Sequence, residues 1–154
     1  TQNRAVTGLD YKTITDQFTT PYQGQIGKSW AVLRNHGCAA NIVDIFILAK
    51  KDVDGLDIAS DQLKKELIDH LENVKMITDF VCIKDGVIIN VDVNISVVVD
   101  KFYRKFEDEY RTKILNKINS FFSIYRWEYG QTLRDGDIIK ELSDMKELNR
   151  IDIT

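Results

Sequence analysis

The sequence predicts an α+β fold: a ferredoxin-like, split β-α-β sheet with its helices on one face, plus an N-terminal helix and an extra strand. Residues 41–49 are almost continuously apolar, which is typical of a strand covered on both faces. Residues 87–99 alternate between apolar and polar side chains, which indicates a strand with one buried and one wet face. From residue 41 onward the predicted elements follow the split β-α-β order: strand, helix, strand, hairpin, strand, helix and strand.

Residues 1–40 precede this core and are expected to pack on it as one helix and one strand. Thr7 is the predicted N-cap of the helix, and Asp10, three residues later, completes a pattern like a capping box. A loop is predicted over residues 19–28, because it contains the only proline and two glycines. A short strand is predicted over residues 29–34.

The elements of the core, residues 41–154, are predicted from caps, turns and periodicity. Ser60 is the expected cap of a helix whose leucines recur at helical spacing. Asp85-Gly86 is a two-residue hairpin signal, because glycine tolerates the positive φ that such a turn requires. Asp100 is the expected cap of a long helix. The predicted helices cover residues 60–74, 101–122 and 136–144, and the predicted strands cover residues 41–49, 79–84, 87–99 and 149–153.

The sheet order is only partly determined by the sequence. Strand 41–49 has two edges, so it cannot pair with three neighbours, and either strand 29–34 or the C-terminal strand must lie elsewhere. Right-handed crossovers would place both long helices on one face. Residues 1–40 and 41–154 are expected to form one compact unit. The start at Thr1 suggests a fragment of a longer chain.

Composition excludes several classes of protein. The chain has 154 residues, 44% of them hydrophobic and 29% charged, and this length supports a sizeable core. A formal net charge of −3 argues against a nucleic-acid partner. No apolar run approaches the roughly 18 residues of a membrane span. Cys38 and Cys82 lie far apart in sequence, which favours a reducing compartment over a disulfide framework.

Motifs for catalysis, cofactor binding and metal binding are absent from the sequence, so we expect no enzyme, no cofactor and no metal. His36 and Cys38 are two possible metal ligands close together, but a site needs three or four. His70, between Asp69 and Leu71 on a predicted helix, is interpreted as a solvated residue rather than a catalytic one.

Two other ferredoxin-like functions are weaker alternatives. Arg34, Asn35 and Asn41 could hold a phosphate as in acylphosphatases, but the glycine-rich cradle before a helix is absent. RNA-binding modules stack bases on aromatic residues of an exposed sheet face. The predicted exposed face consists instead of Asn90, Asp92, Asn94 and Ser96.

Aromatic and strand-end residues are the candidate contacts with other proteins. Tyr125, Trp127 and Tyr129 alternate in a loop, where they either roof the core or form a contact patch, since aromatic residues dominate interface anchors. Strand 87–99 is longer than its predicted hairpin partner, and its overhang is either paired with another subunit or domain or covered internally. The predicted interface residues are Trp30, Tyr125, Trp127, Tyr129, Val97, Val98 and Val99.

The order of these elements resembles the baseplate J-like family, whose members build the wedges of contractile phage tail baseplates and related injection systems. Residues 3–11 (NRAVTGLDY) look like the family's "RAVT..DY" helix entry. The valine ladder of residues 87–99 and residues 130–133 (GQTL), similar to a "G..L" step, follow in the family's order. The sequence departs from the family at residues 75–78, where proline and glycine are usual, and at residues 148–150, where a "GV" step is usual.

This resemblance implies a structural role without catalytic residues or a cofactor. The chain would be the C-terminal part of a wedge subunit that contacts other baseplate proteins around the tail hub, as a homodimer or within a heteromeric wedge. It would be assembled in the host cytoplasm and remain in the virion tail baseplate. The alternative function is a ferredoxin-like small-ligand-binding or regulatory module.

Overall fold

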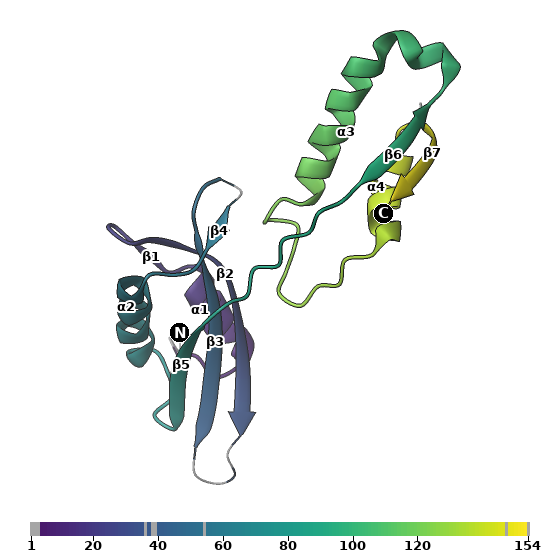
Figure 1. The fold of residues 1–154 in the computed structure, drawn as a ribbon. Helices are drawn as coiled ribbons and strands as arrows, with labels where there is room; N and C mark the ends of the chain where they lie inside the picture. The colour runs from purple at the N-terminus through teal and green to yellow at the C-terminus, as the bar shows by residue number, and fades with distance from the viewer. Residues whose placement is uncertain (1–3, 36, 38–39, 54, 147, 154) are drawn as a thin grey trace. The chain divides into compact units, whose positions relative to one another are not determined.

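The chain forms two compact units, residues 1–88 and residues 89–154. The computed structural model describes residues 4–35, 37, 40–53, 55–146 and 148–153 (Figure 1). The predicted mixture of helices and strands is confirmed. The predicted single compact unit is corrected, because residues 1–88 and 89–154 form separate units. The predicted division after residue 40 is corrected as well, because two strands of one sheet pair with each other across that position.

The sheet of the first unit is built around β3 (Asn41–Lys50). This strand pairs antiparallel with β2 (Gly24–Asn35) and parallel with β5 (Asp79–Asp85). The short strands β1 (Thr19–Thr20) and β4 (Leu56–Asp57) pair with the ends of β2 and β3. The N-terminal strand therefore pairs with the central strand, and the C-terminal strand is the one that lies elsewhere.

The two helices of the first unit, α1 (Gly8–Asp16) and α2 (Asp61–Glu72), begin at the predicted caps. The Thr7 hydroxyl accepts a hydrogen bond from the Asp10 N–H, and the Asp10 carboxylate accepts one from the Thr7 N–H. Ser60 caps α2 with its hydroxyl. These side chains satisfy N–H groups that have no partner within the helix.

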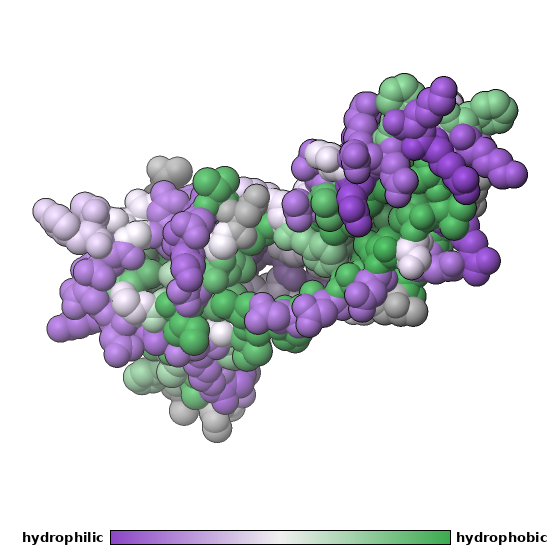
Figure 2. All heavy atoms as spheres, turned by 45° about the horizontal axis from the view of Figure 1, so that its top comes forward, coloured by the Kyte–Doolittle hydropathy of each residue, from purple (hydrophilic) through white to green (hydrophobic). Residues whose placement is uncertain are grey.

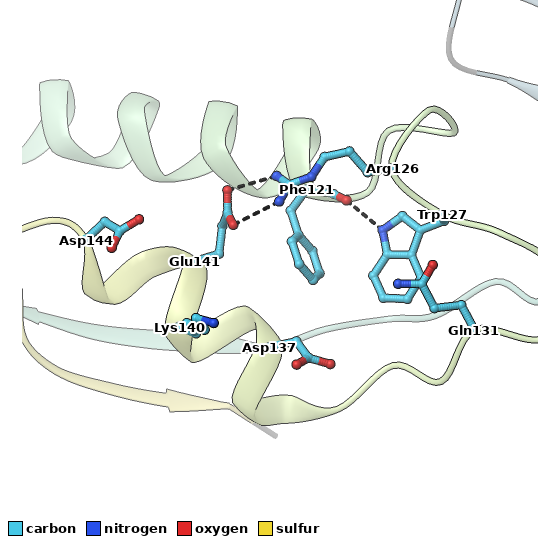
Figure 3. Close-up of a pocket in the computed structure, with 8 residues that line it drawn as sticks. All are labelled: Phe121, Arg126, Trp127, Gln131, Asp137, Lys140, Glu141 and Asp144. Atoms are coloured by element: carbon cyan, nitrogen blue, oxygen red, sulfur yellow. Dashed lines mark hydrogen bonds and ion pairs between the residues drawn. The ribbon is translucent and has the colours of Figure 1, made fainter.

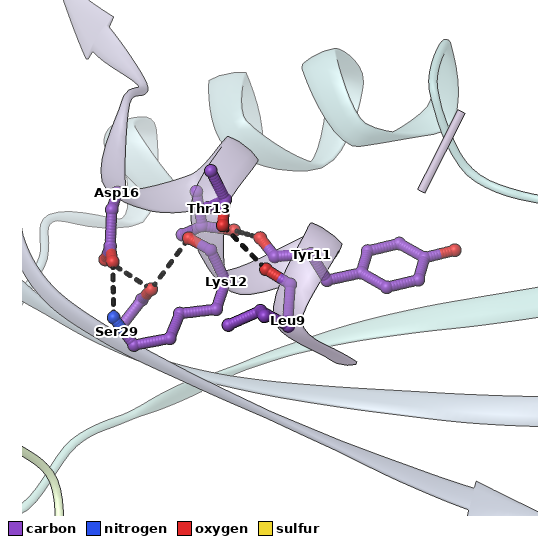
Figure 4. Close-up of polar contacts among 7 residues, drawn as sticks. Leu9, Tyr11, Lys12, Thr13, Asp16 and Ser29 are labelled. Carbon is purple, nitrogen blue, oxygen red and sulfur yellow. Dashed lines mark hydrogen bonds and ion pairs between the residues drawn. The ribbon is translucent and has the colours of Figure 1, made fainter. Parts of the chain in front are cut away.

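The buried hydroxyl of Ser29 connects β2 with α1 (Figure 4). Ser29 on β2 is fully buried, and its hydroxyl lies within hydrogen-bonding distance of the Asp16 carboxylate and the Lys12 carbonyl. Thr15 is also buried and donates to the Tyr11 carbonyl at 2.7 Å. The polar groups between helix and sheet are thus hydrogen-bonded, as burial requires.

Both helices cover the same face of the first sheet. The odd-numbered residues of β3 point toward them, and α2 contributes three fully buried leucines. The core consists of Ala5, Tyr11, Ile26, Val43, Ile45, Ile47, Ala59, Leu63, Leu67 and Leu71. Because side chains alternate along a strand, the even-numbered residues of β3 point to the opposite face.

The second unit contains a separate ribbon of β6 (Ile95–Val99) and β7 (Leu148–Ile153), paired antiparallel. A 3₁₀-helix, η1 (Lys101–Phe106), leads into α3 (Glu107–Phe121), and α4 (Asp135–Ser143) follows. Its buried core consists of Phe121, Ile138 and Leu142, surrounded by partly buried apolar residues. A two-stranded ribbon is marginal by itself in water, so these helices are needed to stabilise it.

Two strand predictions are wrong, and with them the ferredoxin-like sheet. Asp85-Gly86 is no hairpin turn: β5 pairs with β3, and the glycines with positive φ in the described chain are Gly24, Gly37 and Gly130. The predicted 13-residue strand over residues 87–99 shortens to β6, because its partner β7 has only six residues. Two sheets therefore replace the single sheet.

Candidate assembly surfaces

The face of the first sheet opposite α1 and α2 presents apolar side chains to solvent, and we call it the open sheet face. Residues paired across neighbouring strands point to the same side, so Trp30 lies beside Phe46, and Ile42 beside Phe80. Trp30 is 44% exposed and Phe80 is 61% exposed. The open sheet face consists of Trp30, Val32, Arg34, Ile42, Asp44, Phe46, Phe80, Cys82 and Lys84.

A charge network occupies the centre of this face. Asp44 is only 4% exposed and forms ion pairs with Arg34 from β2 and, at 3.1 Å, with Lys84 from β5. The Arg34 hydrogen bond lowers the pKa of Asp44 below its ordinary value, burial opposes that change, and Lys84 adds to it. Lys84 also lies 5.7 Å from the centre of the Phe46 ring. The face thus combines aromatic side chains with paired charges.

On the helix side, Asp79 holds three elements together. The Tyr11 hydroxyl donates to its carboxylate at 2.7 Å, and the Asn41 amide donates at 3.2 Å. Burial, with the hydrogen bond to Asp79, raises the pKa of Tyr11 well above its ordinary value. Lys75 donates to the Asp79 carbonyl. Asp79 is 2% exposed, and we assign this cluster to folding because it joins α1, β3 and β5 inside the core.

The outer edge of β6 is the second candidate surface. In the described part of the chain, β6 pairs with β7 alone, and residues 86–94, which precede it, belong to no helix or strand. Val98 is 53% exposed and Val91 is 53% exposed. No charged residue lies in β6 itself. Uncharged edges with unpaired backbone groups are the places where other strands add to a sheet.

The predicted interface residues divide into exposed and packed ones. Trp30 and Tyr125 are exposed, at 44% and 64%, and Val98 is exposed as well. Trp127 is partly buried: its indole N–H donates to the Phe121 carbonyl at 2.6 Å, and its ring packs against Phe121 and Phe122. The structure therefore places Trp127 in the second core.

The other predicted residues, Val97, Val99 and Tyr129, are partly buried. Three of the seven predicted residues are therefore exposed, and four are partly buried. Trp30 belongs to the first unit and the rest to the second. Figure 2 shows that apolar residues reach the surface in both units.

A pocket of about 330 Å³ in the second unit lies between α4 and the loop after α3 (Figure 3). Arg126 donates to Glu141 through two nitrogen atoms, at 2.9 and 3.1 Å, and this pairing raises the pKa of Arg126 and lowers that of Glu141. Apart from Phe121 and Trp127, the lining is polar or charged: Arg126, Gln131, Asp137, Lys140, Glu141 and Asp144. Small-molecule sites are mostly apolar, so the pocket gives no support to a ligand-binding module.

The residues considered for metal binding, phosphate binding or catalysis either lie outside the described residues or contact other side chains. His36 and Cys38 lie outside the described residues. His70 packs against the Phe18 ring, with ring centres 5.1 Å apart. Arg34 is paired with Asp44, and Asn41 with Asp79. Among the described residues, no three His, Cys, Asp or Glu side chains are grouped so that they could hold a metal ion.

None of the helices within the described ranges has the length and apolar character needed to cross a membrane. No protein-family model and no curated protein matches this chain.

Several exposed aromatic residues are not among the predicted interface residues. Phe102 and Phe106 lie at the start of the predicted long helix, and they are 88% and 55% exposed. The helix starts as η1, and every residue of η1 is exposed. Phe80 was not singled out, although it alternates with Val81 in a strand, which is the available signal for an outward-facing aromatic residue.

Proposed function

We propose that this chain is a structural assembly part of a contractile phage tail baseplate, namely the C-terminal part of a wedge subunit. The observation that carries the proposal is the open sheet face, where Trp30 and Phe80 are exposed around the Arg34 and Lys84 ion pairs with Asp44. Tryptophan, phenylalanine and arginine are enriched in protein interfaces, and a large exposed apolar patch on a folded unit marks a contact site.

The baseplate identity is supported by the order of sequence features from residues 3–11 to residues 130–133. In that role the function is carried by contacts, and no catalytic group is needed. The partners would be other baseplate proteins, in a homodimer or a heteromeric wedge. The chain would be assembled in the host cytoplasm and remain in the virion tail. A baseplate switches between two arrangements, so its contacts must be able to exchange.

Location in the particle tests the identity directly. We expect gold-labelled antibodies against this chain to mark the baseplate end of purified contractile tails from the source that encodes it. Label along the sheath, or tails that contain no trace of the chain by mass spectrometry, would refute the proposal.

The role of the open sheet face is tested by paired substitutions. Trp30→Ser with Phe80→Ser should prevent incorporation of the chain into tails, because it removes the two most exposed aromatic side chains of that face. Tyr22→Ser is the matched control, since Tyr22 is 92% exposed in the same unit but outside the face. Circular dichroism checks that both variants fold. Equal incorporation of the two variants would contradict a contact at this face.

A further inference from the structure

We propose that a second copy of this chain pairs with the outer edge of β6, so that two ribbons join into one antiparallel four-stranded sheet. This inference rests on the proposed assembly function and names one of its contacts. It starts from the second unit alone, where β6 and β7 form a two-stranded sheet within the described residues. A two-stranded ribbon is marginal in water without support, and here the support comes from one side, where α3 and α4 pack on it.

The core beneath this ribbon is small. Its three buried residues lie on α3 and α4, whereas Ile95, Val97 and Val99 of β6 are only partly buried although they face the core side. Adding strands would extend the apolar layer that these side chains share. The ribbon therefore gains more from an additional strand than a wide sheet would.

The edge itself lacks the usual protection against pairing. Natural edge strands are blunted by charged residues, proline, bulges or a covering element. From Val93 to Val99 the chain carries no charge and no proline. The register shift between β6 and β7 lies at the end of the ribbon, between Val98 and Val99. Five of these seven residues are β-branched, which favours extended structure.

The sequence of this segment fits a second copy as the occupant, in a register centred on Ile95. In an antiparallel pair related by a two-fold axis at Ile95, residues 91–99 pair with themselves. Val91 then lies opposite Val99, and Val93 opposite Val97, on one face of the sheet. β-branched pairs of this kind stabilise neighbouring strands. No other strand is required, because the segment is its own complement.

The same register keeps the carboxylates apart. Asp92 lies opposite Val98 of the other copy, and the two Asp92 residues are separated by about six residues, or roughly 20 Å. That distance exceeds the Debye length of about 8 Å at physiological ionic strength. A register centred on Ser96 would instead place Asp92 opposite Asp100, and like charges directly opposite each other are unfavourable. The register centred on Ile95 avoids this repulsion.

The contact is expected to be weak in the isolated chain. Pairing of nine residues covers on the order of a few hundred Å² per copy, below the roughly 800 Å² per partner of a stable complex. The chain should therefore be a monomer at low concentration and form a dimer as concentration rises, as suits a contact that is reinforced by neighbours in a larger assembly.

Mixed cross-linking tests the register. With Cys38 and Cys82 replaced by serine, a chain with Asn94→Cys is mixed with a chain carrying Ser96→Cys, because residue 94 lies opposite residue 96 of the other copy. We expect disulfide dimers in the mixture and few in either chain alone, where the two cysteines lie about 8 Å apart, beyond disulfide reach. Equal dimer yields in the mixture and in the single variants would overturn the proposal.

A charge substitution at Val98 tests the same pairing without cysteine. Val98→Asp lies opposite Asp92 of the second copy and should weaken the dimer several-fold, whereas Val98→Lys should strengthen it several-fold. Within one copy Val98 pairs with Arg150, so the two substitutions affect the ribbon of the monomer in the reverse sense. Light scattering across a concentration series gives both dimer constants. Equal constants, or the opposite order, would overturn the proposal.

The two proposals can fail separately. If gold label marks the baseplate but no mixed cross-link forms, the assembly role stands and the contact at β6 is refuted. If the mixed cross-link forms but the chain is absent from tails, the contact at β6 stands and the baseplate role is refuted.

Discussion

Leu142→Ala should lower the unfolding temperature of the second unit and leave that of the first unit unchanged. Leu142 is fully buried in the small core with Phe121 and Ile138. The core of the first unit shares no residue with this cluster. Each unit therefore has its own apolar contacts, and a cavity in one of them should not weaken the other.

The size of the effect follows from the burial. Truncation of a fully buried leucine to alanine costs about 2–5 kcal/mol. For a domain of 60–100 residues, such as residues 89–154, each kcal/mol lowers the unfolding temperature by about 4–8 °C. A loss of about 3 kcal/mol should therefore lower the temperature of the second transition by about 12–24 °C.

The two tryptophans of the chain allow each unit to be followed separately, because Trp30 belongs to the first unit and Trp127 to the second. In a Trp30→Phe background, thermal fluorescence reports the second unit and should show the full shift. In a Trp127→Phe background it reports the first unit and should show none. Leu67→Ala, in the first core, is the matched control and should give the reverse result. If both reporters shift together for either substitution, the two cores unfold as one and the reasoning fails.

Three further predictions concern the first unit, each measured as the free energy of unfolding in urea. Tyr11→Phe should cost about 1–3 kcal/mol, since it removes a hydrogen bond to the buried carboxylate of Asp79; a change below about 0.5 kcal/mol would contradict this. Ser60→Ala should cost about 1 kcal/mol and Ser60→Asp much less, because aspartate also caps helices; equal losses would argue against the cap. Arg34 lowers the folded-state pKa of Asp44, so the stabilisation is present above the unfolded pKa of about 3.9 and is lost as pH falls toward the folded value. Asp44→Asn should therefore weaken the unit at pH 7 and reduce its further loss of stability between about pH 5 and 2, and an unchanged pH slope would refute the assignment.

The elements that the sequence predicts correctly are those specified by neighbouring residues. Thr7 with Asp10, Ser60 and Asp100 all cap helices as predicted, because a cap is a contact between residues two or three positions apart. The buried strand was predicted from its own apolar run, and β3 is the centre of the sheet. In these cases the local sequence contains all the partners of the interaction.

The pairing of strands was predicted less well, because it depends on residues far apart in the sequence. Asp85-Gly86 has the composition of a hairpin turn, yet β5 is aligned by its parallel ladder with β3, and the Gly86 N–H donates to the Ile47 carbonyl. Continuing that ladder keeps the chain extended where a hairpin would reverse it. Trp127 shows the same limit for the candidate interface residues: its hydrogen bond to the Phe121 carbonyl, which the pattern of alternating aromatics cannot reveal, places it in a core.

The alternation of residues 87–99 is nevertheless informative, because it extends beyond the strand that forms, β6. β7 offers partners for only five of these residues, Ile95 to Val99, but the apolar and polar positions already alternate over the six residues before them, from Ile89 to Asn94. Val93 packs against the second core, whereas Val87, Ile89 and Val91 are 79%, 80% and 53% exposed. A second strand would cover Val91 and Val93 and pair their backbone groups. The part of the pattern that finds no partner within the chain therefore favours a partner outside it, at the edge of β6.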